Sequence, residues 1–534
     1  MPFTRRTYYL LLALIGLTVY LNSFANAFIW DDELLIVGNG YIRSFASILK
    51  IFSTDIFHWI TESNFYRPLF SLSLMFDFSI WKLNPFGYHL TNLILHTFNA
   101  CLLFYLAYIL TSRLRVAFVA SLLFLVHPVH TQAVTYISGR ADPLAAFFML
   151  SATIFFAKAA KSKTNKENIL YLSALICFIY ALLSKEIALV LPLLILCYDY
   201  CFGDIYKNIK IHLLFFALAL FYIILRQQFL PFSSIGMLPF NLAIRLINFP
   251  KVVLFYLSLL IFPWNLRIER SFPAAESFDL SILLSVFILA IILIGIFRAR
   301  NNKIVFFSFL WFSLNLLPLT NVILPLNAFV SEHWLYTASM GFFIILALGC
   351  DKLLSEGISI SKLKLSSRFS LALLIIILTT LSLLTISRNF EWRNSIILFE
   401  STLKSEDNPK DPHTVRVHFN LGYAYLKEGF FDKAIAEFKK ALNRLPFPRS
   451  WRVEYQIGVA YLNKGSLPEA EEHFLKSIEA NPEHISTYSY LIYLYKKTGN
   501  LKKADEIRQR ALKLKPLYPR DQLTQEILRQ EIKP

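Results

Sequence analysis

The chain has few charged residues and few cysteines for its length. Of its 534 residues, 17% are Asp, Glu, Lys or Arg, whereas soluble globular domains usually carry about 25%. The five cysteines all lie in or beside apolar segments, so neither a disulfide framework nor a zinc site is indicated. No GxxxxGK[ST] or GxGxxG loop is present, which argues against nucleotide chemistry.

Apolar residues are abundant instead. They make up 56% of the chain and include 50 Phe and 26 Tyr, a composition that predicts a polytopic membrane protein. The net charge of +17 sits largely in short loops between apolar runs. Membrane orientation and anionic lipid explain it there, so no nucleic-acid partner is expected. Arg5 and Arg6 precede an apolar run without a small-residue cleavage site, which favours an uncleaved first helix.

Twelve apolar segments are long enough to cross a bilayer. They lie near 7–27, 86–110, 114–131, 142–160, 168–184, 186–202, 211–229, 247–263, 280–297, 303–319, 333–350 and 369–387. The positive-inside rule places their basic loops in the cytoplasm; these loops contain Arg5 and Arg6, Arg113 and Arg115, Lys158–Lys166, Lys210, Arg298–Lys303 and Lys352–Arg368. The opposite loops, at 28–66, 127–142, 184–186 and 321–333, are then outside, as is the chain after Arg388.

The helix count between Lys210 and Arg298 is in conflict with this orientation. Both residues are placed inside, which requires an even number of crossings, but three apolar segments separate them. A thirteenth, broken crossing around Pro231–Phe249 is the favoured solution, because Pro and Gly can interrupt a helix beside a protein-buried cavity. The alternative is eleven helices. The predicted membrane domain is therefore residues 1–390 with 11–13 helices.

The tail is charged, helical in period and repetitive. Gly422, Tyr425, Gly429, Ala434, Phe438 and Ala441 recur as Gly458, Tyr461, Gly465, Ala470, Phe474 and Ser477, then as Tyr495, Gly499, Ala504 and Ala511. These steps of 36 and 34 residues predict three tetratricopeptide repeats over 415–516. Residues 391–414 are expected to form a linker or half-repeat, and 517–534 a capping helix and tail. The array would bind a protein partner; a packing module without a ligand is the alternative.

Candidate functional residues gather on the face that is predicted to be outside. The acidic run Asp31–Glu33 follows the first helix, and it is either a site or a solvated loop. The other candidates are Arg67, His127, His130, Arg140, Asp142, Lys185, Glu186, Glu332 and His333. Each alone could cap a helix or neutralise a neighbour. Since an intramembrane charge costs about 3 kcal/mol to insert, so many on one side indicate an active site.

This mixture of side chains suits group transfer from a lipid phosphate. A carboxylate can take the proton of an attacking hydroxyl or position a metal, and Arg, Lys and His can hold an anionic leaving group. An apolar, Phe-rich surrounding would accept a lipid tail. The residues therefore predict transfer from a lipid phosphate to a hydroxyl at the outer face.

Several motifs resemble one family. They are Phe28–Asp32, Tyr66-Arg67-Pro68-Leu69, Leu83–His89, His127-Pro128-Val129-His130, Gly139-Arg140-Ala141-Asp142, Ser184-Lys185-Glu186, Asn315–Pro318 and Tyr336 with Ser339–Gly341. In this order, and followed by the repeats, they are similar to the transmembrane and tetratricopeptide-repeat-containing O-mannosyltransferases. Those proteins belong to the GT-C superfamily, which uses polyprenyl-phosphate-linked sugars. The resemblance implies an all-α fold, a polytopic GT-C-like domain followed by a tetratricopeptide α-solenoid.

The resemblance also implies roles for residues. Asp31 and Asp32 would hold the acceptor and act as catalytic base, while Arg67, His127, His130, Arg140, Lys185 and Glu332 would line the site, the cations facing the donor phosphate. Asp142, Glu186 and His333 are expected beside them. Two departures bear on donor contacts: His333 replaces a usual Arg, and Glu269-Arg270-Ser271 replaces an Asp-Tyr-Ser run. No cofactor is firmly implied, and a divalent metal is left open.

The prediction is a glycosyltransferase that moves a sugar, with mannose suggested by the resemblance, from a polyprenyl-phosphate carrier to a hydroxyl of a protein or other acceptor. The chain lacks any Asn-x-Ser/Thr sequon, which is compatible with a bacterial inner-membrane protein whose site and repeats face the periplasm. Alternatives are a catalytically silent membrane-anchored repeat scaffold, a lipid-carrier transporter, and an enzyme that polymerises or ligates lipid-linked glycans.

Overall fold

The computed structural model describes residues 4–530 except 61–62, 163–165, 231–240, 269, 271, 273, 327, 357, 361–362, 405–411, 444, 446–449 and 518. The chain divides into two units. The first, here the membrane unit, comprises residues 1–56, 64–268 and 272–393. The second, the repeat unit, comprises 57–63, 269–271 and 394–534. Each unit is described by itself.

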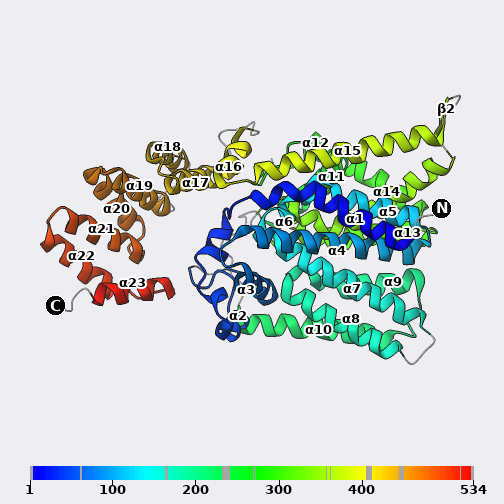
Figure 1. Cartoon of the computed structure of the whole chain (residues 1–534), viewed down its shortest axis with the longest axis horizontal. Coiled ribbons are helices and arrows are strands. Elements are labelled where there is room, and N and C mark those ends of the chain that lie inside the picture. Colours follow the sequence, from blue (N-terminus) through cyan, green and yellow to red (C-terminus); the bar gives the residue numbers. More distant parts are fainter. Residues whose placement is uncertain are drawn as a thin grey trace. The chain divides into compact units, whose positions relative to one another are not determined.

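The membrane unit is a bundle of long apolar helices (Figure 1). Nine helices in the described part of the chain are long and apolar enough to span a membrane: α1 (Arg5–Tyr20, extended by η1, Leu21–Ala25), α4 (Pro85–Thr111), α7 (Ala141–Lys161), α8 (Glu167–Ser184), α10 (Ile209–Phe229), α11 (Leu242–Ile261), α12 (Leu280–Arg298), α14 (Leu335–Glu356) and α15 (Ser367–Glu391). A tenth is α5 (Leu114–Val126), if the bent segment Pro128–Val134 continues it. The chain is a multi-pass integral membrane protein, and its predicted all-α class is confirmed.

Shorter elements complete the membrane unit. The remaining apolar helices are α3 (Pro68–Trp81), α9 (Leu191–Phe202) and α13 (Lys303–Leu316). The loop after α1 contains the short turns η2 (Glu33–Val37), η3 (Tyr41–Arg43) and η4 (Phe45–Ser47), then α2 (Ile48–Phe52). An antiparallel hairpin of β1 (Ile358–Ile360) and β2 (Leu363–Leu365) joins α14 to α15, with Ile358 opposite Leu365.

Every one of the twelve predicted apolar segments coincides with a helix. The proposed extra crossing at 231–249 falls only partly on described residues. Residues 242–249 are the first turns of α11, which continues through Pro250. Residues 231–240 lie outside the described part of the chain.

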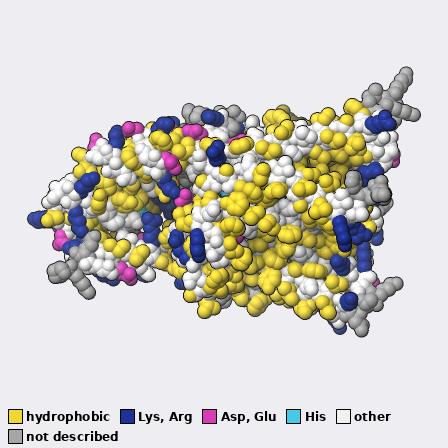
Figure 2. All heavy atoms as spheres, viewed as in Figure 1, with side chains coloured by type: hydrophobic (Ala, Val, Ile, Leu, Met, Phe, Trp, Pro, Cys, Tyr) yellow, Lys and Arg dark blue, Asp and Glu magenta, His cyan; other side chains and the backbone are white. Residues whose placement is uncertain are grey.

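The two ends of the membrane unit differ in charge. At one end, Arg113 and Arg115 both pair with Asp351 at the end of α14, at 3.1 and 3.4 Å, and Arg5 donates to Tyr108. The other end carries the loop after α1 and the junction between α5 and α7. Hydrophobic side chains cover the surface between these ends (Figure 2), as a lipid-facing surface requires.

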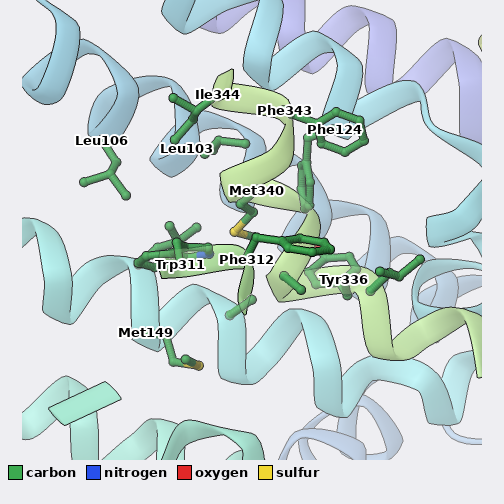
Figure 3. Close-up of a cluster of buried hydrophobic side chains, with 14 of the residues drawn as sticks. Leu103, Leu106, Phe124, Met149, Trp311, Phe312, Tyr336, Met340, Phe343 and Ile344 are labelled. Atoms are coloured by element: carbon green, nitrogen blue, oxygen red, sulfur yellow. The ribbon is translucent and has the colours of Figure 1, made fainter. Parts of the chain in front are cut away.

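The core between α4, α5, α7, α13 and α14 is packed with aromatic and long aliphatic side chains (Figure 3). Trp311 of α13 is buried and donates its indole N–H to the carbonyl of Thr337 at 2.9 Å. A Cβ at Gly341 would lie 2.2 Å from the carbonyl oxygen of Ser308. The glycine therefore lets α13 and α14 approach closely, so that their side chains interdigitate.

The repeat unit consists of helix pairs. They are α17 (Pro412–Lys427) with α18 (Phe431–Leu442), α19 (Trp451–Lys464) with α20 (Leu467–Ala480), and α21 (Ile485–Lys497) with α22 (Leu501–Lys513), preceded by α16 (Ser395–Lys404) and followed by α23 (Pro519–Gln530). A Cβ at Gly422 or Gly458 would lie 2.7 Å from the ring of Phe438 or Phe474. The repeated glycine and phenylalanine therefore fit one another within each pair, which is the physical basis of the predicted repeat.

Candidate active site

Asp32 is held inside the protein by hydrogen bonds. Its side chain is 0% exposed. One carboxylate oxygen accepts the backbone N–H and the hydroxyl of Ser138, at 2.9 and 2.5 Å, and the other accepts the N–H of Ile29 at 3.2 Å. Burial raises the pKa of Asp32 to about 7 against these hydrogen bonds, and the charge of the half-buried Asp31 adds to the increase. A carboxyl with this pKa can accept a proton near neutral pH.

The partner of Asp32 belongs to the irregular segment between α5 and α7. This segment comprises η5 (Pro128–His130), α6 (Thr131–Val134) and η6 (Ile137–Arg140). The buried amide of Asn92, on α4, donates to three of its carbonyl oxygens, those of Val134, Tyr136 and Ile137, at 3.0, 3.2 and 3.3 Å. A non-helical turn inside a membrane protein needs such partners, because lipid offers none.

Three aromatic rings are stacked beside the acidic pair. The ring of Trp30 stacks on Tyr136 with centroids 5.5 Å apart, and Tyr136 stacks on Trp392, also at 5.5 Å. Burial raises the pKa of Tyr136 well above its usual value, and the charges of Asp31 and Asp32 raise it further; a hydrogen bond between the phenol and Asp31 acts in the same direction. Both carboxylates are therefore bonded by residues of one turn.

Two ion pairs join the segments that carry the predicted cations. Lys185 Nζ lies 2.6 Å from Asp142 Oδ1, and both side chains are almost fully buried. Arg67 donates through Nε and Nη2 to one oxygen of Glu186, at 3.1 and 3.0 Å. The charges of Lys185 and Arg67 both act on the His333 ring, so the two pairs and this histidine form one cluster. Asp142 follows Ser138 by four positions, which ties the cluster to the turn that holds Asp32.

Glu332 and His333 also contact this region. Glu332 is 2% exposed and accepts the backbone N–H of Arg267 at 2.5 Å, while its second oxygen lies 3.8 Å from Arg388. The backbone N–H of His333 donates to the side chain of Gln132, on α6, at 3.1 Å. These bonds join the start of α14 to the turn segment and to the end of α15.

Arg140 is placed away from the cluster. Its guanidinium is fully buried and pairs with Asp77 at 2.5 Å. It also donates to Asn92 at 2.6 Å, to the carbonyl of Tyr88 at 2.9 Å and to that of Ser73 at 3.2 Å. With these acceptors, Arg140 fastens η6 to α3 and α4, and its predicted contact with phosphate stays a prediction.

His127 and His130 are likewise interior residues. His127 Nε2 lies 3.1 Å from the carbonyl oxygen of Leu260. His130 Nδ1 lies 2.8 Å from the carbonyl oxygen of Phe124, and its Nε2 lies 3.0 Å from the hydroxyl of Ser339. Both rings are therefore used to hold helices together in this structure, and neither belongs to the cluster around Lys185.

Several residues of the region were not predicted from the sequence. They are Asp77, Asn92, Gln132, Tyr136, Ser138, Arg388, Asn389 and Trp392. One sequence signal was available for Ser138, which directly precedes the Gly139–Asp142 motif. In the described part of the chain, no group of three His, Cys, Asp or Glu residues could hold a metal ion.

Comparison with known proteins agrees with this architecture. A family model described as dolichyl-phosphate-mannose-protein mannosyltransferase matches residues 67–237, and two tetratricopeptide-repeat models match 415–447 and 454–484. The chain thus combines a membrane segment that is similar to that family with a repeat array. Over most of its length it is similar to curated protein O-mannosyl-transferases of the TMTC type.

Three curated relatives from animals are similar to this chain. Protein O-mannosyl-transferase F38B6.6 of Caenorhabditis elegans is 28% identical over 77% of this chain and 59% of that protein. Protein O-mannosyl-transferase Tmtc3 of Drosophila melanogaster is 27% identical, over 81% and 54%. The human TMTC3 is 27% identical, over 80% and 50%. The chain spans about half the length of the curated relatives it matches. The expectation of a bacterial inner membrane gains no support here and stays a prediction.

Among solved structures, the archaeal oligosaccharyltransferase AglB from Archaeoglobus fulgidus, in complex with an inhibitory peptide and a dolichol-phosphate, is similar at a TM-score of 0.42 and 13% identity. The alignment covers 83% of this chain and 60% of that one.

Proposed function

We propose that the chain transfers a mannosyl group from a polyprenyl-phosphate carrier, such as dolichyl phosphate, to a hydroxyl of a protein acceptor. The observation that carries the proposal is the joining, through one turn, of the buried carboxyl of Asp32 and the paired cation Lys185. A carboxylate that takes a proton and a cation that stabilises the leaving phosphate are the two kinds of group that this reaction needs.

The acidic pair supplies the base. As the acceptor oxygen forms its bond to the anomeric carbon, a carboxylate of Asp31 or Asp32 takes the hydroxyl proton. The bond between that carbon and the phosphate oxygen breaks, and its electron pair leaves with the lipid phosphate. Asp32 is enclosed while Asp31 is half-buried, so Asp31 is the carboxylate with access to an acceptor and Asp32 fixes its loop.

The cations Arg67 and Lys185 would bind the phosphate of the sugar donor. Arg67 and Lys185 are held by Glu186 and Asp142, which keep one positive charge in a half-buried position and the other almost fully buried. A lipid phosphate that reaches them would share these charges as it leaves, and His333 would be a further polar contact. Charge on the leaving oxygen is thereby stabilised by groups that are already positioned.

The sidedness of the charges supports catalysis on the non-cytoplasmic face. The end of the bundle with Arg113 and Arg115 is the end that the positive-inside rule assigns to the cytoplasm. The acidic pair lies at the opposite end of α1. The repeat array follows α15 and would recruit a protein acceptor or partner on that outer side.

The test is mannosyl transfer by the full-length chain in proteoliposomes, with dolichyl-phosphate or undecaprenyl-phosphate mannose and a protein acceptor. We expect Asp31→Asn to reduce kcat by at least about 100-fold, as loss of a general base does. Asp351→Asn is the matched control, because it removes an aspartate that pairs with Arg113 and Arg115 at the opposite end of the membrane unit. Absence of transfer by the wild-type chain with both donors would favour the anchored scaffold instead.

A further inference from the structure

The end of α15 is joined to the loop that carries the acidic pair. Asn389 is 0% exposed, and its amide nitrogen lies 3.0 Å from both the carbonyl oxygen of Val19 and the side-chain oxygen of Asn22. The amide of Asn26 donates in return to the carbonyl of Asn389 at 3.1 Å. The N–H of Ala27 donates to the carbonyl of Arg393 at 3.0 Å. The chain just before Asp31 therefore lies against the end of α15.

The same helix end contacts the turn that bonds both carboxylates. The hydroxyl of Thr135 donates to the side-chain oxygen of Asn389 at 2.6 Å. One residue further along that turn, the ring of Tyr136 is enclosed between Trp30 and Trp392. Trp392 is 0% exposed, so its stacking face is fixed by the interior of the membrane unit.

The backbone of Trp30 has an unfavourable conformation that the aromatic stack can stabilise. Its φ is +51°, in the left-handed region, which costs a bulky L-residue on the order of 1 kcal/mol or more. Trp30 directly precedes Asp31 and Asp32, so its backbone conformation sets where the two carboxylates point. An aromatic stack worth about 1 kcal/mol beyond its burial can offset that cost.

We propose that Trp392 is a positioning residue for the acidic pair, holding Trp30 in its left-handed conformation through the ring of Tyr136. It would act through the loop and not on the reacting atoms. The kinetic part of the test rests on the proposed transferase function, but its main readout does not.

The main readout is the protonation of Asp32, measured by its labelling with dicyclohexylcarbodiimide, a hydrophobic reagent that reacts with protonated carboxyl groups. Full-length protein is labelled across a pH series and Asp32 modification is quantified by mass spectrometry. Asp31 and Tyr136 are the titratable groups whose charges act on this carboxyl. In the wild type, labelling should fall with a midpoint near pH 7, because protonation is lost there.

Trp392→Leu keeps an apolar side chain but cannot stack. We expect its labelling midpoint to fall by at least about one pH unit, since a loosened loop admits water to Asp32 and lowers its pKa. Trp392→Phe should keep the wild-type midpoint. Trp264→Ala is the matched control, because Trp264 is 64% exposed and lies outside the stack. In transfer assays, Trp392→Leu should lower kcat about 10-fold and leave the donor KM unchanged.

An unchanged midpoint in Trp392→Leu protein that elutes and melts as the wild type does would overturn the proposal, and so would an equal fall in Trp264→Ala. If Trp392→Leu does not fold, Trp392→Phe decides, because a ring that still stacks must preserve the midpoint. If neither the wild type nor any variant transfers mannose, the proposed function is wrong. The labelling result still decides the role of Trp392 in that case.

Discussion

Ser138 donates two hydrogen bonds to the same carboxylate oxygen of Asp32, one from its backbone N–H and one from its hydroxyl. The geometry depends on the next residue, because a Cβ at Gly139 would lie 2.3 Å from the carbonyl oxygen of Gln132. The turn can therefore present both donors only with glycine at that position. This arrangement counteracts the burial of Asp32 and sets the pH at which it ionises.

Ser138→Ala should shift the pH profile of mannosyl transfer toward higher pH. Removing the hydroxyl deletes a hydrogen bond that favours the charged carboxylate, so the pKa of Asp32 should rise further above about 7. Because the ionised carboxylate of Asp32 fixes the loop that carries Asp31, the acidic limb of the pH profile of kcat/KM should shift upward by about one unit, and activity at pH 7 should fall about 5-fold. Ser138→Thr retains the hydroxyl and is the control. A profile that stays in place would mean that Asp32 is not the titrating group.

Asp32→Asn should reduce the loss of folding stability as pH rises. The pKa of this carboxyl is raised from 3.8 to about 7 on folding, so its contribution is fully present below pH 4 and is lost as pH rises toward 7. Burying the ionised form costs the wild type up to about 4 kcal/mol above pH 7. The thermal midpoint of the wild type should therefore decline from pH 5 to pH 8 more than that of Asp32→Asn. Parallel curves would contradict the burial of an ionisable Asp32.

Arg140→Lys should lower the stability of the membrane unit and leave the donor KM unchanged. A planar guanidinium reaches Asp77, Asn92 and two carbonyls at once, and an ammonium group cannot. The expected loss is about 3 kcal/mol, the scale of a broken buried ion pair. Thermal unfolding in detergent measures it, and Arg67→Lys, at a less buried pair, is the comparison. A stable Arg140→Lys protein with a raised donor KM would instead return Arg140 to the donor site.

The sequence could predict the helices because a lipid-spanning helix has a strong signal of its own. Each apolar segment carries that signal locally, and the repeats carry theirs in spacing. Contacts between distant residues have no such signal. Arg67 and Glu186 are 119 positions apart, and Asp32 and Ser138 are 106 apart. The sequence could indicate Arg67, Glu186 and Asp32 as site residues, but it could not show which residues they contact, and it did not indicate Ser138.

Arg140 illustrates the limit most clearly. It shares a short motif with Asp142, and both are charged residues at a helix start. In the structure, successive residues of a tight turn point in different directions, so Ser138 and Asp142 meet Asp32 and Lys185 while Arg140 turns into the interior. Its acceptors include main-chain carbonyls, which any sequence would offer, so the burial of Arg140 could not be read from composition or spacing.

Two successive repeats contain the same contact between a histidine and a glutamate, with the two residues exchanged. His418 Nδ1 lies 2.6 Å from Glu437 Oε2, and Glu454 Oε2 lies 2.6 Å from His473 Nδ1. The positions correspond, because both members of the second pair follow those of the first by 36 residues. Burial alone would raise the pKa of Glu437, but hydrogen bonds from His418 and from Lys440 hold it below its usual value.

Glu437→His alone should therefore destabilise the first repeat by about 1 to 3 kcal/mol, since it removes the carboxylate that bonds both His418 and Lys440. Adding His418→Glu recreates the second repeat's arrangement and should recover most of that loss, apart from the exposed contact with Lys440, which is worth little. Hydrogen exchange of α17 and α18 in the full-length chain measures both effects, with α21 and α22 as the internal reference. A double variant no more protected than the single one would show that the two pairs are not interchangeable, and that the repeats differ in packing around them.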